Sequence, residues 1–276
     1  MPELPEVELT RRKLLPLISG ERITAFHSAW PRNIIGASRI AMARELPGRA
    51  IRSVERRGKV LLVDLSGAPA RQFAVHLCMS GRLAVEPAGS VRSPWARAWW
   101  TLGNGTELRF IDPRKFGRIW YGDPARLLAH AYLSSLGPDA RTIGREAFIR
   151  RVAGRRAGIK ALLLRQDTIA GIGNILADES LWRARIHPRA IAASLSAKTL
   201  GRLHRALLAT IAASLRAGGS SLRDWAGPDG ARGGFREHHR VYGRAGSHCP
   251  RCRCVLKRMI VAGRGTTACS RCQRNR

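Results

Sequence analysis

Four cysteines near the end of the chain set the strongest constraint on what it can fold into. Cys249 and Cys252 form one C-x2-C pair, Cys269 and Cys272 form a second, and 16 residues separate the pairs. This spacing is typical of a zinc site in which two tight turns each present two thiolates and a β-hairpin closes the tetrahedron. Four thiolates leave no open position, so we expect one structural Zn²⁺. The alternative, a redox dithiol, requires a single pair in a thioredoxin-like unit.

The rest of the tail is strongly basic. Residues 238–276 contain ten Lys or Arg and no Asp or Glu. Between the cysteine pairs, residues 257–265 predict a basic hairpin suited to contact with phosphate groups. Cys254 adds a fifth thiol, which could compete as a metal ligand; the simpler interpretation is a spare thiol.

The positive charge extends beyond the tail. Among 276 residues there are 49 Lys or Arg against 19 Asp or Glu, so the formal net charge is 49 − 19 = +30. Forty-three of the 49 are arginines; codon bias could explain that preference, but not the scarcity of acids. A chain with this net charge has a positive electrostatic field that attracts polyanions, of which nucleic acid is the commonest.

Composition also excludes several classes of protein. A hydrophobic share of 45% is ample for folded domains and excludes intrinsic disorder. No apolar run reaches the roughly 18 residues of a membrane span, and the N-terminus lacks the basic and apolar segments of a secretory signal. We therefore expect a cytoplasmic chain that does not contact membrane, with its cysteines reduced rather than paired in disulfides.

Hydrophobic periodicity divides the chain into parts. Residues 4–18 follow a helical period, whereas residues 22–122 hold short β-like runs, with a hairpin turn at Gly-Asn-Gly 103–105, as in an antiparallel sandwich or barrel. Helices are predicted at 127–136, 145–152, 159–164 and 200–215, followed by a mobile glycine-rich loop at 218–234. The predicted domains are residues 1–125, 126–240 and 241–276.

Pro2 is a candidate nucleophile. Removal of Met1 would leave its secondary amine at the N-terminus, and an α-amino group has a pKa near 8, well below the roughly 10.4 of lysine. Attack on an aldehydic carbon would give an iminium, which is an electron sink for elimination, and Glu3 could move protons beside it. From spacing alone, however, Pro and Glu are ordinary residues at a helix start.

Several separated motifs resolve that ambiguity. Together with the four-cysteine tail, the opening Met-Pro-Glu-Leu-Pro-Glu-Val-Glu closely resembles the formamidopyrimidine-DNA glycosylases, bacterial enzymes of base excision repair. Further motifs of that family follow in order: Arg-Arg-Gly-Lys 56–59, His-Leu-Cys-Met-Ser-Gly 76–81, Asp-Pro-Arg-Lys-Phe-Gly 112–117, Gly-Ile-Gly-Asn 171–174 and Val-Tyr-Gly-Arg 241–244.

The resemblance implies an α+β multidomain fold: an N-terminal antiparallel β-sandwich, a helix–two-turn–helix domain and a C-terminal β-hairpin zinc finger, with double-stranded DNA bound between them. It implies a bifunctional glycosylase and AP lyase for oxidised purines such as 8-oxoguanine and formamidopyrimidines. Pro2 would attack C1′ and expel the base, and Glu3 would act as general acid/base before β,δ-elimination. We expect a monomer without a nucleotide cofactor. The implied catalytic set is Pro2, Glu3, Lys59 and Arg264.

The same resemblance assigns DNA contacts. His76, Asn174 and Arg264 would bind phosphates that flank the lesion. A flipped base leaves a void in the duplex, which the family fills with three side chains. Their chemistry suits that role, because Met adapts to a gap, Phe wedges a base step and Arg hydrogen-bonds the orphaned base. In this chain the three are Met79, Arg114 and Phe116.

The loop at 218–234 matches the lid that the family places over the flipped purine. The Ser220 carbonyl would recognise the N7 proton of 8-oxoguanine, and backbone amides would surround its O6. A solvent-exposed linker is the alternative. The amides belong to Leu222, Arg223, Asp224 and Trp225.

Three features depart from the family pattern. Cys78 stands where the family has Gly, Cys254 is an extra thiol in the finger, and Arg155 with Arg156 replaces lysines. Two other functions stay open: an endonuclease VIII-like enzyme for oxidised pyrimidines, and a lesion-binding protein without turnover. The former usually begins Pro-Glu-Gly-Pro, so Leu4 and the Met/Arg/Phe trio favour the purine branch.

Overall fold

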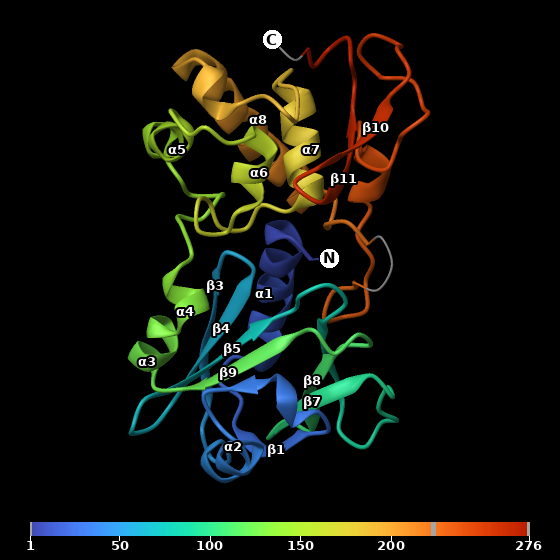
Figure 1. Cartoon of the computed structure of the whole chain (residues 1–276). Coiled ribbons are helices and arrows are strands. Elements are labelled where there is room, and N and C mark those ends of the chain that lie inside the picture. The colour runs from blue at the N-terminus through green and yellow to red at the C-terminus, as the bar shows by residue number, and fades with distance from the viewer. Residues whose placement is uncertain (1, 222–224, 275–276) are drawn as a thin grey trace. The chain divides into compact units, whose positions relative to one another are not determined.

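The structure is a computed structural model that describes residues 2–221 and 225–274. The chain divides into two compact units. Unit 1 contains Met1–Ser134 together with Gly218–Gly234, and unit 2 contains Ser135–Ala217 together with Phe235–Arg276 (Figure 1). The glycine-rich loop thus belongs to unit 1, although the sequence places it between parts of unit 2. The division into three domains at residues 125 and 240 stays a prediction.

Unit 1 begins with the predicted helix, α1 (Leu4–Ile18). A proline in the first turn fits there because its missing N–H would have no partner in the helix. Val7, Leu14 and Ile18 are fully buried on one face, and α1 packs against strands β3 (Ile51–Arg57) and β4 (Val60–Leu65). The helical period of residues 4–18 is therefore confirmed.

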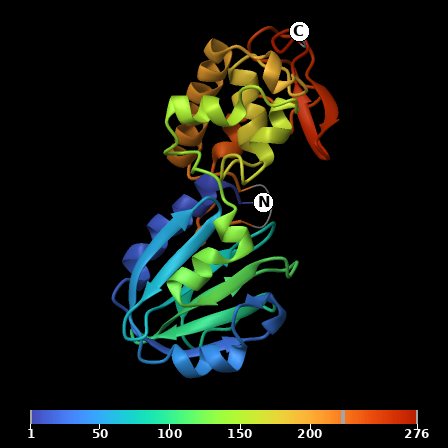
Figure 2. The ribbon, with the colours of Figure 1, turned by 60° about the vertical axis from the view of Figure 1, so that its left-hand side comes forward.

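Two sheets form the predicted sandwich of unit 1. One has the order β1-β7-β8-β6 and the other β2-β9-β5-β4-β3, and strands β3, β4 and β5 lie side by side in Figure 2. Between the sheets, the ring of Phe73 on β5 stacks on that of Trp100 on β7, 4.8 Å between centroids. The remaining strands are β1 (Ile23–Ser28), β2 (Ile34–Ile35), β5 (Arg71–His76), β6 (Arg82–Pro87), β7 (Ala96–Leu102), β8 (Thr106–Ile111) and β9 (Arg118–Gly122).

Several helical segments differ from the sequence prediction. The predicted helix at 127–136 is two short helices, α3 (Pro124–Ala129) and α4 (Ala131–Ser134), because His130 is extended and its Nδ1 accepts the N–H of Tyr132. Within the β region the prediction also missed the 3₁₀ turn η1 (Pro31–Asn33) and the helix α2 (Arg39–Glu45).

Unit 2 is helical, followed by a β-hairpin. Its helices are α5 (Arg145–Val152), α6 (Ile159–Leu164), α7 (Asn174–Arg183) and α8 (Ala197–Arg216), with 3₁₀ turns η2 (Ala192–Ser194) and η3 (Phe235–His238). Helices α5, α6 and α8 confirm predictions, whereas α7 was not predicted. The hairpin is β10 (Lys257–Val261) and β11 (Arg264–Ala268), as expected between the cysteine pairs. In the described part of the chain, no helix has the length and apolar character that crossing a membrane requires.

Candidate functional site

Pro2 and Glu3 lie at the start of α1. Both are buried, and Glu3 is the residue that caps the helix. The Glu3 backbone N–H donates to Oε2 of Glu6 at 2.8 Å, so the first turn of the helix fixes the chain leading to Pro2. Acidic side chains suit this position because the N-terminal end of a helix carries partial positive charge.

Glu6 was not singled out by the sequence analysis, yet it connects two predicted site segments. Its other oxygen, Oε1, accepts the backbone N–H of Ser220 at 2.8 Å. Burial, followed by repulsion from Glu3, raises the pKa of Glu6 to about 7, although the two backbone hydrogen bonds oppose that rise. The carboxyl group therefore changes charge close to neutral pH, at the junction of Pro2's helix and the glycine-rich loop.

The described part of the loop, 218–221 and 225–234, folds against itself and α1. Ser220 pairs with Gly234 in an isolated antiparallel bridge. Gly219 has a φ of +81°, and a Cβ there would lie 3.1 Å from Oε1 of Glu6, so this position requires glycine. Trp225 is buried, 6% exposed. These residues form a packed loop and not an exposed linker. The predicted contacts Leu222, Arg223 and Asp224 lie outside the described residues.

Lys59 lies in the turn before β4, next to the strand position that pairs with His76. Lys59 precedes Val60, which pairs with His76 across β4 and β5. Lys59 is only 5% exposed. The turn before it is tied to α1, because Arg56 donates to the Gly58 carbonyl at 2.9 Å and forms an ion pair with Glu8 at 3.1 Å.

His76 is held as a neutral donor. Burial, then the charges of Lys59 and Arg118, lowers its pKa to about 4. Its Nδ1 accepts the backbone N–H of Cys78 at 3.1 Å, so that nitrogen carries no proton. The proton is therefore on Nε2, which leaves an uncharged donor suited to a phosphate oxygen.

Cys78 replaces a family glycine without losing the glycine-like backbone. Its φ is +52°, in the left-handed region that favours glycine. Its Sγ lies 2.8 Å from Nδ1 of His76, and burial raises the pKa of the thiol to about 11. The thiol is thus protonated at neutral pH, and a non-glycine residue takes the left-handed conformation directly before Met79.

The predicted void-filling trio lies on two exposed turns of unit 1. Met79 is 39% exposed and Phe116 is 48% exposed, which is unusual for apolar side chains of this size. The guanidinium of Arg114 stacks over the ring of Phe116, 4.8 Å from its centroid. These three side chains are available to a ligand and are not part of the core.

Asp112, which the sequence analysis passed over, joins these two turns. It is fully buried, and its Oδ1 accepts the Ser80 hydroxyl at 2.5 Å and the Arg114 backbone N–H at 3.2 Å. Its Oδ2 accepts the Gly117 N–H at 2.7 Å. One carboxylate therefore fixes the backbone on both sides of the trio.

Asn174 and Arg264 come together in unit 2. Asn174 is the first residue of α7, not part of a simple turn as predicted, and its Nδ2 donates to the Gly265 carbonyl at 2.9 Å. Arg264 is exposed at the start of β11, directly after the turn of the hairpin. A helix N-terminus, an amide and an exposed guanidinium are suitable donors to an anion.

A buried ion pair supports that arrangement. Lys160, completely buried, donates to Oδ1 of Asp178 at 2.5 Å and to the Thr266 hydroxyl at 2.6 Å. Oδ2 of Asp178 accepts the Thr267 N–H at 3.2 Å. Burial raises the pKa of Asp178 to about 6 even though Lys160 opposes the shift. The pair links α6, α7 and β11, and thereby positions the hairpin.

The four predicted metal ligands form one cluster. Their sulfur atoms all lie within 4.8 Å of one another, with 4.0 Å between Cys249 and Cys272 and 3.3 Å between Cys252 and Cys269. Zn–S bonds of about 2.3 Å require sulfurs roughly 3.8 Å apart, so the thiols fit Zn²⁺. The cluster is a structural zinc finger, and the predicted zinc site is confirmed.

The predicted residues thus fall into two groups. Unit 2 holds Asn174, Arg264 and the four cysteines. Unit 1 brings Pro2, Glu3 and Ser220 together through Glu6, and brings Lys59 beside His76. It also carries Met79, Arg114, Phe116 and Trp225.

Comparison with known proteins gives the family. The model of the formamidopyrimidine-DNA glycosylase N-terminal domain matches residues 1–119, and that of its H2TH domain matches residues 135–225. A formamidopyrimidine-DNA glycosylase of Geobacillus kaustophilus is 42% identical, covering 99% of this chain and 100% of the relative. That of Bacillus subtilis is 38% identical, covering 99% of each.

Solved structures agree over the whole chain. The MutM (Fpg) protein of Thermus thermophilus is 40% identical with a TM-score of 0.88, covering 99% of both chains. A Lactococcus lactis Fpg mutant in complex with DNA containing Fapy-dG is 30% identical with a TM-score of 0.92, covering 99% of this chain and 100% of that chain.

A β-sandwich, an H2TH region and a four-thiol hairpin together define a class of multidomain DNA glycosylases. The chain belongs to the formamidopyrimidine-DNA glycosylase family. Its activity is that of the family: a DNA glycosylase with AP lyase activity that removes oxidised purines in base excision repair.

Proposed function

We propose that Pro2, exposed by removal of Met1, is the nucleophile of this glycosylase. The observation that carries the proposal is its position directly before the capping residue of α1, where the helix dipole disfavours a protonated amine. Its nitrogen attacks C1′ of the damaged nucleoside, and the bond from C1′ to the base breaks with its electron pair and a proton going to the base. The nitrogen lone pair then breaks the C1′–O4′ bond, O4′ takes a proton, and the iminium forms. The iminium permits loss of a C2′ proton with the 3′ phosphate, followed by loss of a C4′ proton with the 5′ phosphate. Water finally releases the sugar fragment and restores the amine.

Glu3 moves the protons of that sequence. Its buried carboxyl follows Pro2 directly, within reach of the opening sugar ring. Lys59, at the turn that Arg56 and Glu8 tie to α1, supplies a positive charge for the sugar's phosphate. The zinc ion takes no part in the chemistry; the metal is held by Cys249, Cys252, Cys269 and Cys272 and keeps Arg264 in place.

The glycine-rich loop covers the flipped base. The Ser220 carbonyl accepts the N7 proton that distinguishes 8-oxoguanine from guanine, and the following amides, from Leu222 to Trp225, donate to its O6. Glu6 holds the Ser220 N–H at 2.8 Å, which fixes the backbone of the residue proposed to contact the base. Met79 and Phe116 enter the void in the duplex, and Arg114 hydrogen-bonds the orphaned base.

The partner is double-stranded DNA that contains oxidised bases or abasic sites, bound by one copy of the chain in the bacterial cytoplasm. Lactococcus lactis relatives are known in complex with abasic-site DNA and with Fapy-dG DNA, which supports this choice. His76 through Nε2, Asn174 and Arg264 bind phosphates near the lesion. Each of these three side chains donates hydrogen bonds and carries no negative charge, so it does not repel a phosphate.

Borohydride trapping tests the nucleophile and the lesion class together. Reduction of the iminium should link the protein to a duplex carrying 8-oxoguanine opposite cytosine, and the adduct should map to Pro2. The Pro2→Gly variant should lose most of the adduct, whereas Pro16→Ala, which changes an exposed proline of the same helix, should keep it. An adduct that maps elsewhere would disprove the assignment of Pro2.

Two further measurements distinguish the alternative functions, an enzyme for oxidised pyrimidines and a lesion-binding protein without turnover. A Lactococcus lactis relative is also known in complex with oxidised-pyrimidine DNA, so a panel of purine and pyrimidine lesions should be compared. Faster excision of pyrimidines would identify an endonuclease VIII-like specificity. If an intact-mass spectrum shows that Met1 is retained, the amine is blocked and the protein binds lesions without turnover.

A further inference from the structure

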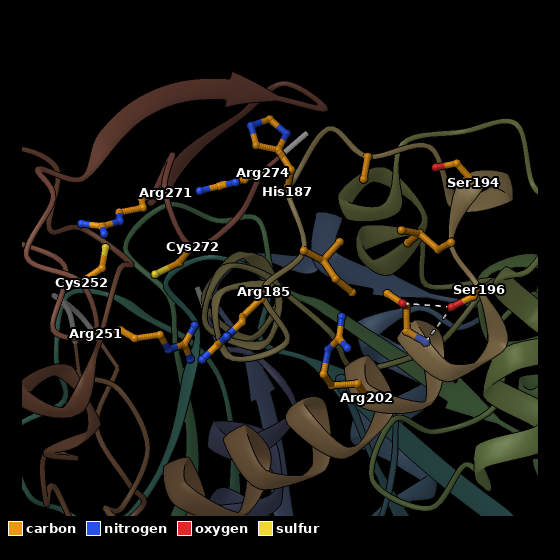
Figure 3. A pocket seen from close by; sticks show the side chains of 14 residues that line it. Arg185, His187, Ser194, Ser196, Arg202, Arg251, Cys252, Arg271, Cys272 and Arg274 are labelled. Atoms are coloured by element: carbon orange, nitrogen blue, oxygen red, sulfur yellow. Dashed lines mark hydrogen bonds between the residues drawn. The ribbon is translucent and has the colours of Figure 1, made fainter. Parts of the chain in front are cut away.

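A pocket lies within unit 2, away from the residues proposed to contact the damaged duplex. Its volume is about 640 Å³, and its lining combines the α7–α8 connection with the four-cysteine finger. In Figure 3, Arg251, Arg271 and Arg274 come from the finger, and Arg185 and Arg202 come from the helical side.

The pocket is strongly basic. Five arginines and His187 line it, together with the hydroxyl-bearing side chains of Ser194, Ser196 and Thr199, and no Asp or Glu is among the lining residues. Within residues 2–221 and 225–274, none of the five guanidinium groups forms an ion pair with a carboxylate. Charged groups of one sign gathered in a concave site repel one another, so a structural role alone does not account for all of them.

Two of the arginines are held rigidly by the end of α7. Nε of Arg202 donates to the Ala184 carbonyl at 2.8 Å, and Nη1 of Arg251 donates to the Trp182 carbonyl at 3.1 Å. Arg251 also stacks 4.2 Å above the Trp182 ring. A guanidinium has five N–H donors, so each retains donors for a ligand after these contacts.

The metal site explains only part of the charge. Cys252 and Cys272 line the pocket, and Zn²⁺ bound by four thiolates carries a net charge of −2. The five arginines and the zinc site together therefore carry a net charge of 5 − 2 = +3, which an external anion would neutralise. The N-terminus of the 20-residue helix α8, capped by Ser196, adds partial positive charge on the other side.

The pocket is distinct from the proposed contacts to the damaged duplex. Arg185 follows the C-terminal end of α7, whereas Asn174 is its first residue. Ten helical residues span about 15 Å, so one duplex phosphate at Asn174 does not reach the pocket. A ligand here would be additional to the lesion-bearing strand.

We propose that this pocket binds a chain of two or more adjacent phosphate groups. Guanidinium forks bind phosphate oxygens in pairs. The Thr199 hydroxyl, which accepts a hydrogen bond from Ser196, adds a neutral donor beside them. The cavity is too large for a single phosphate and carries enough charge for several. The chain of phosphates is either a second nucleic acid strand or a free oligophosphate. An acidic peptide would offer carboxylates in place of phosphates, and the test below distinguishes that outcome.

The test uses the zinc-loaded full chain, first saturated with a duplex containing an uncleavable abasic-site analogue. Inorganic tripolyphosphate, hexathymidylate and hexaglutamate are then titrated separately by calorimetry at one fixed salt concentration, because phosphate binding depends on salt. The pocket variant is Arg185→Gln with Arg271→Gln. The control, Arg150→Gln with Arg205→Gln, removes the same charge from exposed positions of unit 2 outside the pocket.

We expect tripolyphosphate to bind the saturated complex of the wild type and of the control. Binding should weaken by about tenfold for each pocket arginine removed, since each supplies charge-assisted hydrogen bonds. Excision of 8-oxoguanine by the pocket variant should equal that of the wild type, which keeps this result separate from the catalytic assignment. If hexathymidylate binds much more tightly than tripolyphosphate, the ligand is a strand; the reverse order identifies a free oligophosphate.

Three results would overturn the proposal: no phosphate binding to the saturated complex, an equal loss in the control variant, or hexaglutamate binding as tightly as the phosphate probes. Zinc content is measured for each variant, because Arg271 lies next to a metal ligand. Should zinc be lost, the single variant Arg185→Gln leaves the finger sequence unchanged and decides the question alone.

Discussion

The Glu6 carboxylate accepts the Ser220 backbone N–H at 2.8 Å, across 214 positions of sequence. The same carboxylate accepts the N–H of Glu3, so it joins the proposed catalytic end of α1 to the loop proposed to cover the flipped base. An abasic-site duplex has no base for the loop to cover but still requires the lyase chemistry. Comparing it with a duplex that carries 8-oxoguanine should therefore separate the role of Glu6 in base recognition from its role in catalysis.

The Glu6→Gln variant should lose base excision more than lyase activity. An amide keeps one acceptor oxygen, so one of the two backbone N–H groups loses its partner, at a cost of roughly 1.5–3 kcal/mol. We expect excision of 8-oxoguanine to slow by about tenfold to hundredfold, and cleavage at an abasic site, which has no base to cover, to change by about twofold or less. Single-turnover rates on the two duplexes measure this. Glu55→Gln, at an exposed position of β3, is the control; equal losses on both duplexes would contradict the role of the loop.

Glu6 should also make stability depend on pH. Its pKa is raised from 4.5 to about 7 by burial and then by Glu3, so the folded state holds a proton that the unfolded state releases. The stability due to Glu6 is therefore complete below pH 4.5 and is lost as the pH rises through 7. Relative to Glu6→Gln, the wild type should lose up to about 3 kcal/mol in free energy of unfolding between about pH 4 and pH 8. Urea titrations at the two pH values give the difference, and a constant difference would exclude the shift.

Asp112→Ala should loosen both turns of the void-filling trio. The change leaves the Ser80 hydroxyl and the N–H groups of Arg114 and Gly117 without their partner, which should lower the free energy of unfolding by about 3 kcal/mol. Discrimination among bases opposite the lesion should fall, because Arg114 is proposed to contact that base. Urea unfolding and excision from duplexes with each opposite base test both effects. Asp167→Ala, at an exposed ion pair, should change stability by less than about 1 kcal/mol.

Lys160→Met should destabilise unit 2 because it leaves Asp178 buried without its cation. We expect a loss of about 3–5 kcal/mol in free energy of unfolding, most of which the double variant Lys160→Met with Asp178→Leu should restore. Lys198→Met, at an exposed position, should have little effect. Chemical unfolding followed by Trp fluorescence provides the measurement. A double variant no more stable than Lys160→Met would show that the pair contributes more than charge compensation.

Zinc removal should unfold the finger and weaken DNA binding. Without the metal, four thiols replace the tetrahedral site that holds the β10–β11 hairpin, and Arg264 loses its fixed position. Chelation should change the fluorescence of Trp182, whose Nε1 donates to Sγ of Cys249 at 3.4 Å. Cys249→Ser should behave like the chelated protein, whereas Cys254→Ser should retain zinc and bind DNA normally. Full DNA binding by metal-free protein would be incompatible with the finger's role.

Features encoded by neighbouring residues could be predicted from the sequence. The helical period of α1, the Gly-Asn-Gly hairpin and the cysteine spacing each involve local signals, and all three are present in the structure. Helix α7 escaped prediction because residues 175–182 are all buried, so the helix has no polar face to reveal its period.

The supporting residues of the site escaped prediction for a different reason. Glu6, Asp112 and Lys160 act through partners that the fold brings to them from distant positions. A single acidic or basic residue carries no local pattern that distinguishes such a role from solvation. The assignment of Pro2 likewise came from the family resemblance, since its local sequence is that of an ordinary helix start.

The placement of the glycine-rich loop in unit 1 affects how this chain could have been assembled and how it can be dissected. The polypeptide passes from one unit to the other three times, after Ser134, after Ala217 and after Gly234. Neither unit is therefore a continuous stretch of sequence. A gene fragment that stops at residue 134 encodes the sandwich without Ser220 and Trp225, and one that begins at residue 135 carries those residues without the helix against which their loop folds. Recombination that exchanges contiguous segments cannot transfer either unit intact, so chimaeras between relatives should exchange residues 218–234 together with the N-terminal 134 residues.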